Sequence, residues 1–588
     1  MKKFLLGILC GFVFAGLATV VVFFALVRFA SKSAPETPSE SMLVLRLEGE
    51  ISEKPGDEQP LPWMDAQTPL SVIEIRQLLE RAATDNKIKA LLLEPSRMGG
   101  GWAKTEEIRG QIAEFKKSGK PVYAFLRTPN TKDYMLATVA DRISMVGEDH
   151  VDLKGLRAER MYYKNTLDKL GVQMEIVHAG KYKDFGDSYT KTAMSPESKE
   201  SLNALLDGIY SVLVNSIASG RKRSPEEVKR LIDGGPYLAK DALAAKLVDS
   251  LEYENQTIDE LARKANISSK SRTSARDYRK IIRDGWDSQR SNKIAYLVAE
   301  GDIIRGELGG FGDDGMVASR KFIRDVEALG KDENYSGVVL RIDSPGGDAI
   351  ASDELLAALR SLSKAKPMVV SMSDVAASGG YYMAVTGDTI TAYPSTITGS
   401  IGVVYGKPNV KGLYDKLGLT KDMLKRGQNA DIDVEDRPLS EIALKKLREG
   451  VDESYRSFLA RVAEGRRAKV EEIAPLAEGR AWVANDPNAK RLTDQLTGLT
   501  GAIAELRKKM NLKADDRMRL YPYPAPESAW RKWFGEADLG VQARARLAET
   551  LLGDAGSVAR VKEVRRALRP ALVQGGMLRW MPYAIEVR

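Results

Sequence analysis

The two halves of the chain carry the same succession of strand and helix patterns. Each opens with a short β-rich run that ends in glycine, Leu43–Gly49 in the first half and Ile294–Gly301 in the second. In both halves a helical pattern, an apolar strand run, a Gly-Gly loop and another helical pattern follow. In the first half these are helix Ser71–Ala83, strand Ala90–Leu93 and helix Thr105–Lys117. In the second half they are helix Ala318–Leu329, strand Val338–Ile342 and helix Asp353–Ala365. Strands of Val, Ile and Leu that alternate with helices predict a parallel α/β sheet in each half. Ser71 is a natural N-cap for the first of these helices.

Matching landmarks in the two halves lie at one constant spacing. Gly171 and Gly418, for example, are 247 positions apart. A spacing shared by many landmarks indicates an internal duplication. The copies differ in chemistry, because the second carries Ser378 where the first has about Asn130.

The length of the chain favours more than one domain, since 588 residues exceed what a single hydrophobic core supports. Composition and the repeat divide the chain into six predicted segments: 1–30, cytoplasmic stub and transmembrane signal anchor; 31–42, linker; 43–266, N-terminal repeat; 267–292, connector; 293–512, C-terminal repeat; 513–588, basic C-terminal extension.

An uncharged run near the N-terminus is long enough to cross a membrane. It covers Phe4–Val27, 24 residues, which make about 36 Å of helix against a hydrocarbon core of about 30 Å. The length of the run and the charge of Arg28 disfavour a cleaved signal peptide. Lys2 and Lys3 precede it, so the positive-inside rule predicts a single-pass anchor with a cytoplasmic N-terminus and the body outside the cytoplasm.

Histidine and cysteine are scarce in this chain. Two residues are histidine and one is cysteine, while 43% are apolar and 29% charged, as in ordinary globular proteins. Cys10 lies inside the apolar run, so we expect neither a disulfide framework nor a cysteine metal site. With only His150 and His178, sites that need three histidines are excluded, and a Ser-His-Asp triad would have to use one of these two. We expect no metal and no cofactor.

The C-terminal region is basic. Residues 541–588 hold nine basic and four acidic side chains, a net charge of +5 out of +8 for the chain. Two interpretations stay open: an amphipathic element on anionic lipid headgroups, or a tail that packs on its own protein or on a neighbouring subunit. Nucleic acid is not an expected partner, because the body is predicted to lie outside the cytoplasm.

Ser378 has the surroundings of a nucleophile. A serine that attacks an amide needs a base, donors for the oxyanion and a rigid position. Gly379 follows Ser378 and could open a helix, and Gly346 and Gly347 follow a buried strand, so the amides of these three glycines are candidate oxyanion donors. The alternative interpretation of Ala-Ser-Gly-Gly is a motif for tight packing of a helix on a strand.

The base is expected to be a lysine, because histidine is nearly absent. A lysine base must be neutral, which requires its pKa of about 10.4 to fall by roughly 3 units, or some 4 kcal/mol, through burial. The chain has many lysines, and composition does not choose among them. The segment Gly180–Asp184 contains Lys181 and Lys183, and Lys183 aligns with Ala430 of the second half. One copy has therefore kept a lysine and the other a serine.

Three segments of the second half identify a family resemblance: Leu340–Gly347, Ala377–Met383 and Thr398–Val403. Together they closely resemble the signal peptide peptidase A family of serine peptidases in its long, two-repeat form. The resemblance covers about residues 1–510 and the closing Met581–Arg588. It implies a tandem crotonase/ClpP-like α/β fold behind an N-terminal transmembrane helix, assembled as a homotetrameric bowl on the periplasmic side of the membrane.

The resemblance also implies roles for individual residues. The nucleophile of the family falls on Ser378, its general-base lysine on Lys183, and the serine that holds the lysine amine on Ser400. Two residues depart from the pattern, Asp348 after the glycine pair and Asp184 after the lysine. A carboxylate close to Lys183 would raise the pKa of the amine, so Asp184 must point away or the base is Lys181.

The expected function is therefore a membrane-anchored Ser/Lys endopeptidase of the bacterial inner membrane. Its expected substrates are remnant signal peptides and other apolar or unfolded peptides, and its expected partners are membrane lipid and further copies of the same chain. A tethered scaffold without turnover is the alternative if Lys183 pairs with Asp184. Acyl-CoA chemistry on a crotonase frame is a weaker alternative, because CoA is cytoplasmic.

Overall fold

The computed structural model describes residues 40–56, 69–285, 292–307, 315–513, 516–526 and 577–580. The predicted membrane anchor, nearly all of the predicted linker and most of the predicted C-terminal extension lie outside these residues. So do residues 308–314, which make up most of the glycine-rich stretch Gly306–Gly315.

The first half folds around a parallel sheet of six strands in the order β8-β4-β3-β2-β1-β9. The strands are β1 (Ser41–Gly49), β2 (Ile88–Met98), β3 (Val122–Leu126), β4 (Arg142–Met145), β8 (Ser250–Leu251) and β9 (Arg272–Ser274). The helices of the half include α3 (Val72–Thr84), α4 (Trp102–Lys116), α5 (Thr131–Ala137), α8 (Pro196–Arg221), α11 (Glu254–Ala265) and α12 (Ala275–Gly285). The central strands are apolar on both faces because helices cover both, as in other parallel sheets.

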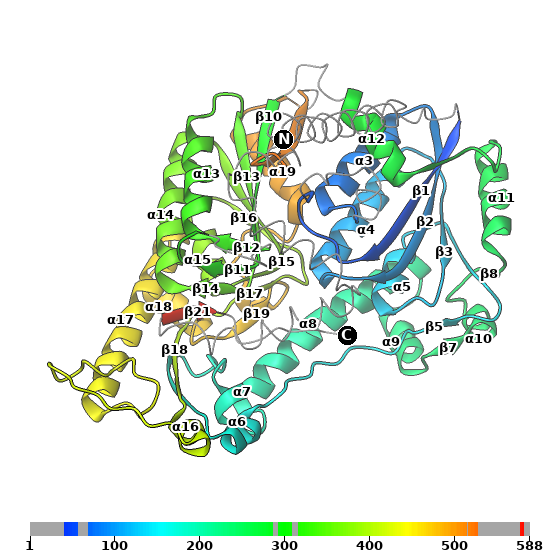
Figure 1. Ribbon diagram of the computed structural model, residues 1–588. Helices are drawn as coiled ribbons and strands as arrows, with labels where there is room; N and C mark the ends of the chain where they lie inside the picture. Colours follow the sequence, from blue (N-terminus) through cyan, green and yellow to red (C-terminus); the bar gives the residue numbers. More distant parts are fainter. Residues whose placement is uncertain are drawn as a thin grey trace, which may run out of the picture.

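The second half has a similar sheet in the order β19-β17-β15-β13-β10-β20, with β16 beside β15; its strands are parallel except for β19, which pairs antiparallel with β17 (Figure 1). The strands are β10 (Asn292–Glu300), β13 (Gly337–Ser344), β15 (Met368–Ala377), β16 (Ile390–Thr391), β17 (Ile397–Gly399), β19 (Ala481–Val483) and β20 (Met518–Tyr523). The helices include α13 (Ser319–Lys331), α14 (Ala349–Ala365), α15 (Gly379–Ala384), α17 (Glu441–Gly465) and α19 (Gly498–Lys509). The predicted tandem α/β fold is thus confirmed.

Local sequence signals are placed as predicted. Ser71 is the N-cap of α3 and forms a capping box, in which the Ser71 amide and hydroxyl donate to Glu74 Oε2 at 2.9 and 2.7 Å. At the limits of the two repeats, β9 and α12 lie in the predicted connector, 267–292, and β20 lies in the predicted extension, 513–588. Both strands complete the edge of their own repeat's sheet, β9 on β1 and β20 on β10.

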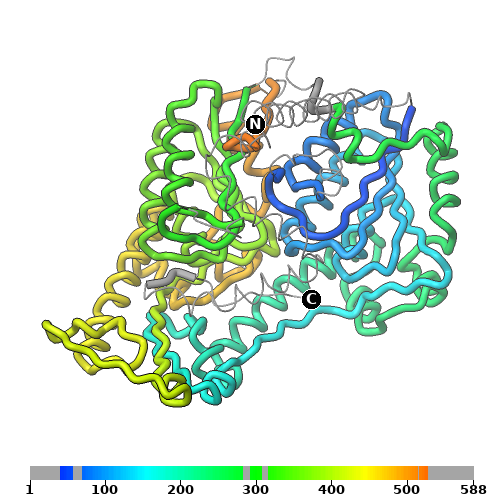
Figure 2. The backbone as a smooth tube through the Cα atoms, viewed as in Figure 1, coloured from blue at the N-terminus to red at the C-terminus, as the bar shows by residue number. Residues whose placement is uncertain are grey.

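A third sheet joins the two halves. Its order is β12-β11-β14-β21-β18-β6, from β6 (Gln173–Ala179), β11 (Asp302–Ile304), β12 (Met316–Ala318), β14 (Gly346–Asp348), β18 (Val403–Asn409) and β21 (Met577–Trp580). The first-half strand β6 pairs antiparallel with β18 of the second half, from Gln173 opposite Asn409 to Ala179 opposite Val403. The segment after about residue 150 crosses beneath the molecule to reach this sheet (Figure 2). Here the Leu413 amide donates to the Gly171 carbonyl at 3.0 Å, between α6 (Lys164–Leu170) and α16 (Lys411–Leu417).

Within the described part of the chain, α8 is the one helix long and apolar enough to span a membrane. Half of its most apolar window is buried inside the protein. Its buried side chains, among them Leu205, Leu213 and Ile217, belong to the core of the first half. Helix α8 also contacts β19, so it is a core helix that ties the first half to the second.

Candidate active site

Ser378 occupies a strained corner between a strand and a helix. It follows β15 and is the N-cap of α15, with φ 53° and ψ −116°. Such a conformation costs a residue with a side chain on the order of 1–3 kcal/mol and persists only where neighbours enforce it. The Ser378 amide donates to the Gly399 carbonyl at 2.7 Å, and the Ser378 carbonyl accepts from the Tyr382 amide at 2.8 Å. The side chain is fully buried.

Lys183 reaches Ser378 from the other half of the chain. Its amine Nζ lies 2.9 Å from Ser378 Oγ, 3.0 Å from Ser400 Oγ and 3.1 Å from the Ser400 carbonyl oxygen. The Lys183 side chain is fully buried. Burial disfavours the charged form of an amine, so this environment suits a neutral lysine. Ser378, Lys183 and Ser400, which the sequence singles out, are thus brought together.

Lys181, the alternative lysine, lies elsewhere. It is exposed, and its amine lies 5.0 Å from the centre of the Tyr182 ring.

The loop that carries Lys183 is held against a glycine turn of the second half. The Tyr182 amide donates to the Glu478 carbonyl at 2.8 Å. Gly479 has φ +75°, and a Cβ there would lie 2.5 Å from Lys183 Cβ and 2.6 Å from the Lys183 amide nitrogen. Only glycine fits this contact, and no motif in the sequence points to it.

The Asp184 carboxylate pairs with Arg160. Arg160 Nη1 lies 2.7 Å from Asp184 Oδ2, and the two side chains are 6% and 3% exposed. The carboxylate that follows Lys183 in the chain thus has an arginine partner, while the amine of Lys183 contacts Ser378 and Ser400. Sequence reasoning missed Arg160, because a single arginine 24 residues upstream of its partner carries no local signal.

The second departure, Asp348, is a helix cap. Its Oδ1 accepts from the Ala351 amide at 2.8 Å at the start of α14, and its carboxylate pairs with Arg305 at 2.9 Å. These contacts give it a structural role at the end of the glycine loop.

The three predicted oxyanion glycines lie at the ends of elements beside Ser378. Gly379 is the first residue of α15, and an amide in that position has no acceptor within its helix. Gly346 and Gly347 open β14 with φ of 103° and 157°. The Gly346 amide donates to Ser344 Oγ at 3.2 Å, and a Cβ on Gly380 would overlap the Ser344 carbonyl. The glycine loop and the serine helix are therefore in contact.

Charged groups join the halves just before the serine. Asp374, four residues ahead of Ser378, accepts from the Gly101 and Lys104 amides at 2.7 and 2.9 Å and so caps α4 of the first half. The Lys104 amine lies 2.8 Å from Asp343, which accepts from the Val375 amide at 3.0 Å. Burial and the nearby Asp343 raise the pKa of Asp374 to about 6.

A buried ion pair lies beneath this cap. Arg341 Nε is 2.9 Å from Glu53 Oε2, and both side chains are fully buried. Burial alone would raise the pKa of Glu53, but the charges of Arg341 and Lys104 lower it to about 2. Glu53 comes from the first half and Arg341 from β13, so this pair also crosses the interface.

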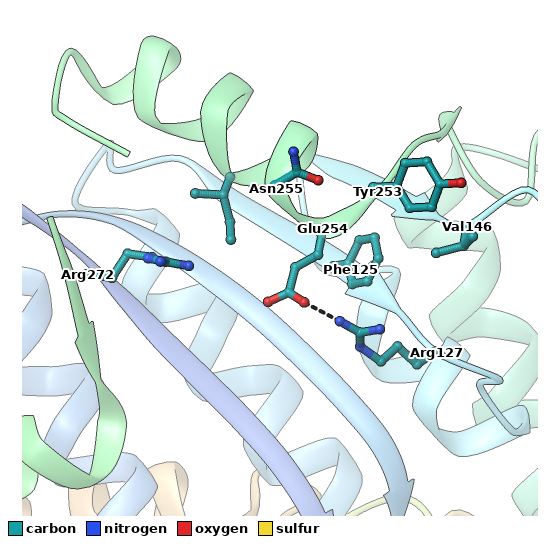
Figure 3. A pocket seen from close by; sticks show the side chains of 8 residues that line it. Phe125, Arg127, Val146, Tyr253, Glu254, Asn255 and Arg272 are labelled. Carbon is teal, nitrogen blue, oxygen red and sulfur yellow. Dashed lines mark hydrogen bonds and ion pairs between the residues drawn. The ribbon is translucent and has the colours of Figure 1, made fainter. Parts of the chain in front are cut away.

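A separate cavity lies on the first half. Its volume is about 380 Å³, and it lies between β3, the end of β4 and α11. Arg127 and Glu254 form an ion pair in its wall, and Arg272 faces them from the other side (Figure 3). Neither Ser378 nor Lys183 lines it. Within the described residues, no group of three or more His, Cys, Asp or Glu side chains could hold a metal ion.

Comparison with protein families identifies the family of the chain. The model of peptidase family S49 matches residues 114–268 and 360–513, one segment in each half. The chain belongs to peptidase family S49. It is therefore a serine peptidase, and the predicted resemblance is confirmed.

Individual relatives extend over most of the chain. The chloroplastic serine protease SPPA of Arabidopsis thaliana is 30% identical, over 83% of this chain and 72% of that protein. Protease 4 of Haemophilus influenzae is 28% identical over 97% and 93%, and Protease 4 of Salmonella typhi is 29% identical over 83% and 81%.

Solved structures match a smaller part of the chain. An enoyl-CoA hydratase from Shewanella pealeana is 9% identical over 36% of this chain and 69% of that chain, with a TM-score of 0.20. An enoyl-CoA hydratase from Mycobacterium avium subsp. paratuberculosis is 14% identical over 37% and 75%, with a TM-score of 0.19. With scores this low, the fold assignment depends on the sheets described above.

Proposed function

We propose that this serine peptidase cuts peptide bonds with Ser378 as nucleophile and Lys183 as general base. The observation that carries the proposal is the 2.9 Å contact between Lys183 Nζ and Ser378 Oγ. Serine and lysine come from different halves of a duplicated chain, and both are fully buried. A contact of this length is within the reach that proton transfer between base and nucleophile requires.

The three partners of the lysine amine match its neutral form. A neutral amine has two N–H groups and one lone pair. The N–H groups can donate to Ser400 Oγ and to the Ser400 carbonyl, at 3.0 and 3.1 Å. The lone pair is then left for the hydroxyl proton of Ser378.

The reaction follows from this geometry. Ser378 Oγ attacks the substrate carbonyl while Lys183 takes the hydroxyl proton, and the amides of Gly379 and the Gly346–Gly347 loop stabilise the oxyanion. Lys183 then gives the proton to the leaving amine, and an acyl-enzyme forms on Ser378. A water that loses its proton to Lys183 hydrolyses the acyl-enzyme.

The third sheet supports recognition of extended peptides. Its strand β21 lies antiparallel to both β14 and β18, with Leu578, Arg579 and Trp580 opposite Asp348, Gly347 and Gly346 (Figure 1). The backbone of β21 thus runs along the glycine loop toward Ser344, which contacts the serine helix. A substrate that added a strand in this position would need an unfolded segment.

We also propose that apolar peptides, chiefly remnant signal peptides, are the substrates, cut at the bacterial inner membrane by an enzyme anchored through residues 4–27. The catalytic body would be periplasmic and homotetrameric. An exposed apolar group supports association between copies: Met161, Leu170, Leu417, Leu419 and Leu424 are 50% to 92% exposed on the segments around α6 and α16. Apolar side chains gathered in this way are typical of an interface.

The test of this mechanism is turnover of an apolar peptide ester and of casein by the detergent-solubilised full chain. Ser378→Ala and Lys183→Ala are expected to lose at least about 10³-fold in kcat while they stay folded and assembled. Lys181→Ala is the matched control and should keep activity. If Lys181→Ala loses activity and Lys183→Ala keeps it, Lys183 is not the base. If the wild-type protein cuts neither substrate, the interpretation as a scaffold without turnover is favoured.

A further inference from the structure

We propose that Arg160 is a positioning residue for the peptidase reaction, which holds and neutralises Asp184 so that the adjacent Lys183 can act as base. The inference rests on the proposed function, because it assumes that Lys183 is the base. Arg160 lies on the extended segment before α6, and its side chain is 6% exposed.

Arg160 binds Asp184 at two places. Its Nη1 donates to the carboxylate Oδ2 at 2.7 Å, and its Nη2 donates to the Asp184 backbone carbonyl. The first contact compensates a buried negative charge. The second holds the backbone of the residue that directly follows Lys183. A planar guanidinium can make both bonds at once, which an ammonium on a flexible stem does less well.

Two serines complete the site around Arg160. Its Nε donates to Ser188 Oγ at 2.9 Å and its Nη1 to Ser198 Oγ at 3.1 Å. Ser198, in the first turn of α8, donates in turn to Asp184 Oδ2. Arg160 thereby ties the segment before α6, the lysine loop and the start of α8 together.

The consequence for Lys183 is electrostatic. Asp184 is 3% exposed, so water screens its charge poorly. An uncompensated carboxylate next to the lysine in the chain would favour the ammonium, which cannot accept the proton of Ser378. The guanidinium of Arg160 lies 2.7 Å from this carboxylate and offsets its negative charge.

The other charged and titratable groups around the loop have partners of their own. Asp187 forms an ion pair with Lys191 at 2.8 Å. Glu200 pairs with Arg480 at 2.5 Å and accepts from the Tyr182 hydroxyl at 2.9 Å, and Glu478 accepts from the Lys181 amide at 3.2 Å. The guanidinium carbon of Arg160 lies 5.6 Å from the ring centre of Tyr162. Burial is the main cause that raises the pKa of Tyr162, so it stays neutral near pH 7. Asp184 pairs with the cation of Arg160 and also accepts a hydrogen bond from the neutral Ser198 hydroxyl.

The experiment measures how fast Ser378 is acylated as a function of pH. A fluorophosphonate probe reacts once with an activated serine, and intact mass quantifies the adduct without any need for peptide turnover. The variants are Arg160→Gln, Asp184→Asn, the double variant and Arg160→Lys, with Lys183→Ala as the control that loses base catalysis. Thermal unfolding of each variant reports folding.

Arg160→Gln is expected to shift the pH–rate profile toward alkaline pH by about one unit. At pH 7 the rate should fall about tenfold and recover at high pH. The double variant should return the profile close to wild type, because it removes the charge that Arg160 neutralises. Arg160→Lys should lie between wild type and Arg160→Gln.

Loss of rate in Arg160→Gln with an unchanged midpoint, or a double variant that fails to recover, would overturn the inference in favour of a purely structural role. Failure of both Arg160→Gln and the double variant to fold would do the same. Failure of the proposed function gives a different result: Lys183→Ala would then be acylated as fast as wild type at every pH.

Discussion

At the scale of residues, the site depends on backbone geometry as much as on reactive groups. Ser378 and Ser400 both have positive φ, 53° and 51°, and Gly479 has φ +75° against the backbone of Lys183. These conformations place the hydroxyls of Ser378 and Ser400 within hydrogen-bond distance of the Lys183 amine. A substitution that moves this backbone by a fraction of an ångström should therefore affect the reaction.

Gly479→Ala should lower kcat at least tenfold while the protein stays folded. The new Cβ would lie 2.5 Å from Lys183 Cβ and must displace the lysine. Gly427→Ala is the matched control, since Gly427 also has positive φ, +91°, but a Cβ there meets nothing within 4 Å. Both variants pay a backbone strain of about 1 kcal/mol. Equal activity in the two variants, measured with a peptide ester, would contradict the role of the Gly479 contact.

At the scale of elements, the two halves meet through charged groups that cap and pair across the interface. Asp374 of the second half caps α4 of the first, and Lys104 of α4 contacts Asp343 of β13. Carboxylates around Lys104 raise its pKa, although burial alone would lower it. The buried Lys104 amine and the carboxylates around it therefore stabilise one another's charged forms at this interface.

Lys104→Met should destabilise the protein by about 3–5 kcal/mol. The substitution keeps the volume of the side chain but leaves buried carboxylates of Asp343 and Asp374 without their cation. Urea unfolding measures the loss, and Lys117→Met, at an exposed ion pair at the opposite end of the same helix, is the control. A change below about 1 kcal/mol in Lys104→Met would show that the carboxylates find other compensation.

Glu106 on α4 makes the interface sensitive to pH. It accepts from the Ser395 amide at 3.0 Å, and burial raises its pKa to about 7. A carboxyl whose pKa is higher in the folded than in the unfolded state binds more protons when folded, so the free energy of unfolding falls as pH rises from about 4.5 to 7. Glu106→Gln should flatten this part of the profile. Chemical denaturation at pH 5 and pH 8 measures the free energy of unfolding of wild type and of Glu106→Gln. An equal change between the two pH values in both proteins would contradict the prediction.

At the scale of the whole molecule, the third sheet combines the two halves with the C-terminal region. Its strands β6 and β18 bring the lysine loop beside the second half, and β14 carries the glycine loop. Strand β21 lies between β14 and β18, in the position that we propose for an extended substrate. On this proposal, a peptide competes with the chain's own strand.

Removal of residues 577–588 should increase kcat/KM for a short apolar peptide by about threefold or more. The reason is that the position of β21 becomes open to substrate. The fluorophosphonate rate at Ser378 serves as the control and should change little. A truncated protein that is folded but no more active would show that substrates bind elsewhere.

Leu424→Asp should dissociate the proposed assembly. Leu424 is 92% exposed, the highest value among the large apolar side chains of the described residues. A carboxylate there would be costly to bury between copies. Analytical ultracentrifugation in detergent measures the mass, and Leu243→Asp, at an apolar side chain 38% exposed on the first half, is the control. An unchanged mass in Leu424→Asp would place the interface elsewhere.

The sequence by itself determined the repeat and the α/β class, and it predicted Ser378 as the candidate nucleophile. Strand and helix periodicity, capping at Ser71 and the constant spacing of 247 are local or one-dimensional signals, and they can be read from the chain directly. The resemblance to a peptidase family then selected Lys183 among many lysines.

Only the tertiary structure decided how the lysine and serine meet and what surrounds them. The pairing of β6 with β18, the fit of Gly479 against Lys183 and the pairing of Arg160 with Asp184 join segments far apart in the chain. Such contacts depend on packing and on the burial of charge, which no local pattern encodes. For that reason the sequence shows that a carboxylate, Asp184, follows the proposed base, but only the tertiary structure shows that Asp184 pairs with Arg160.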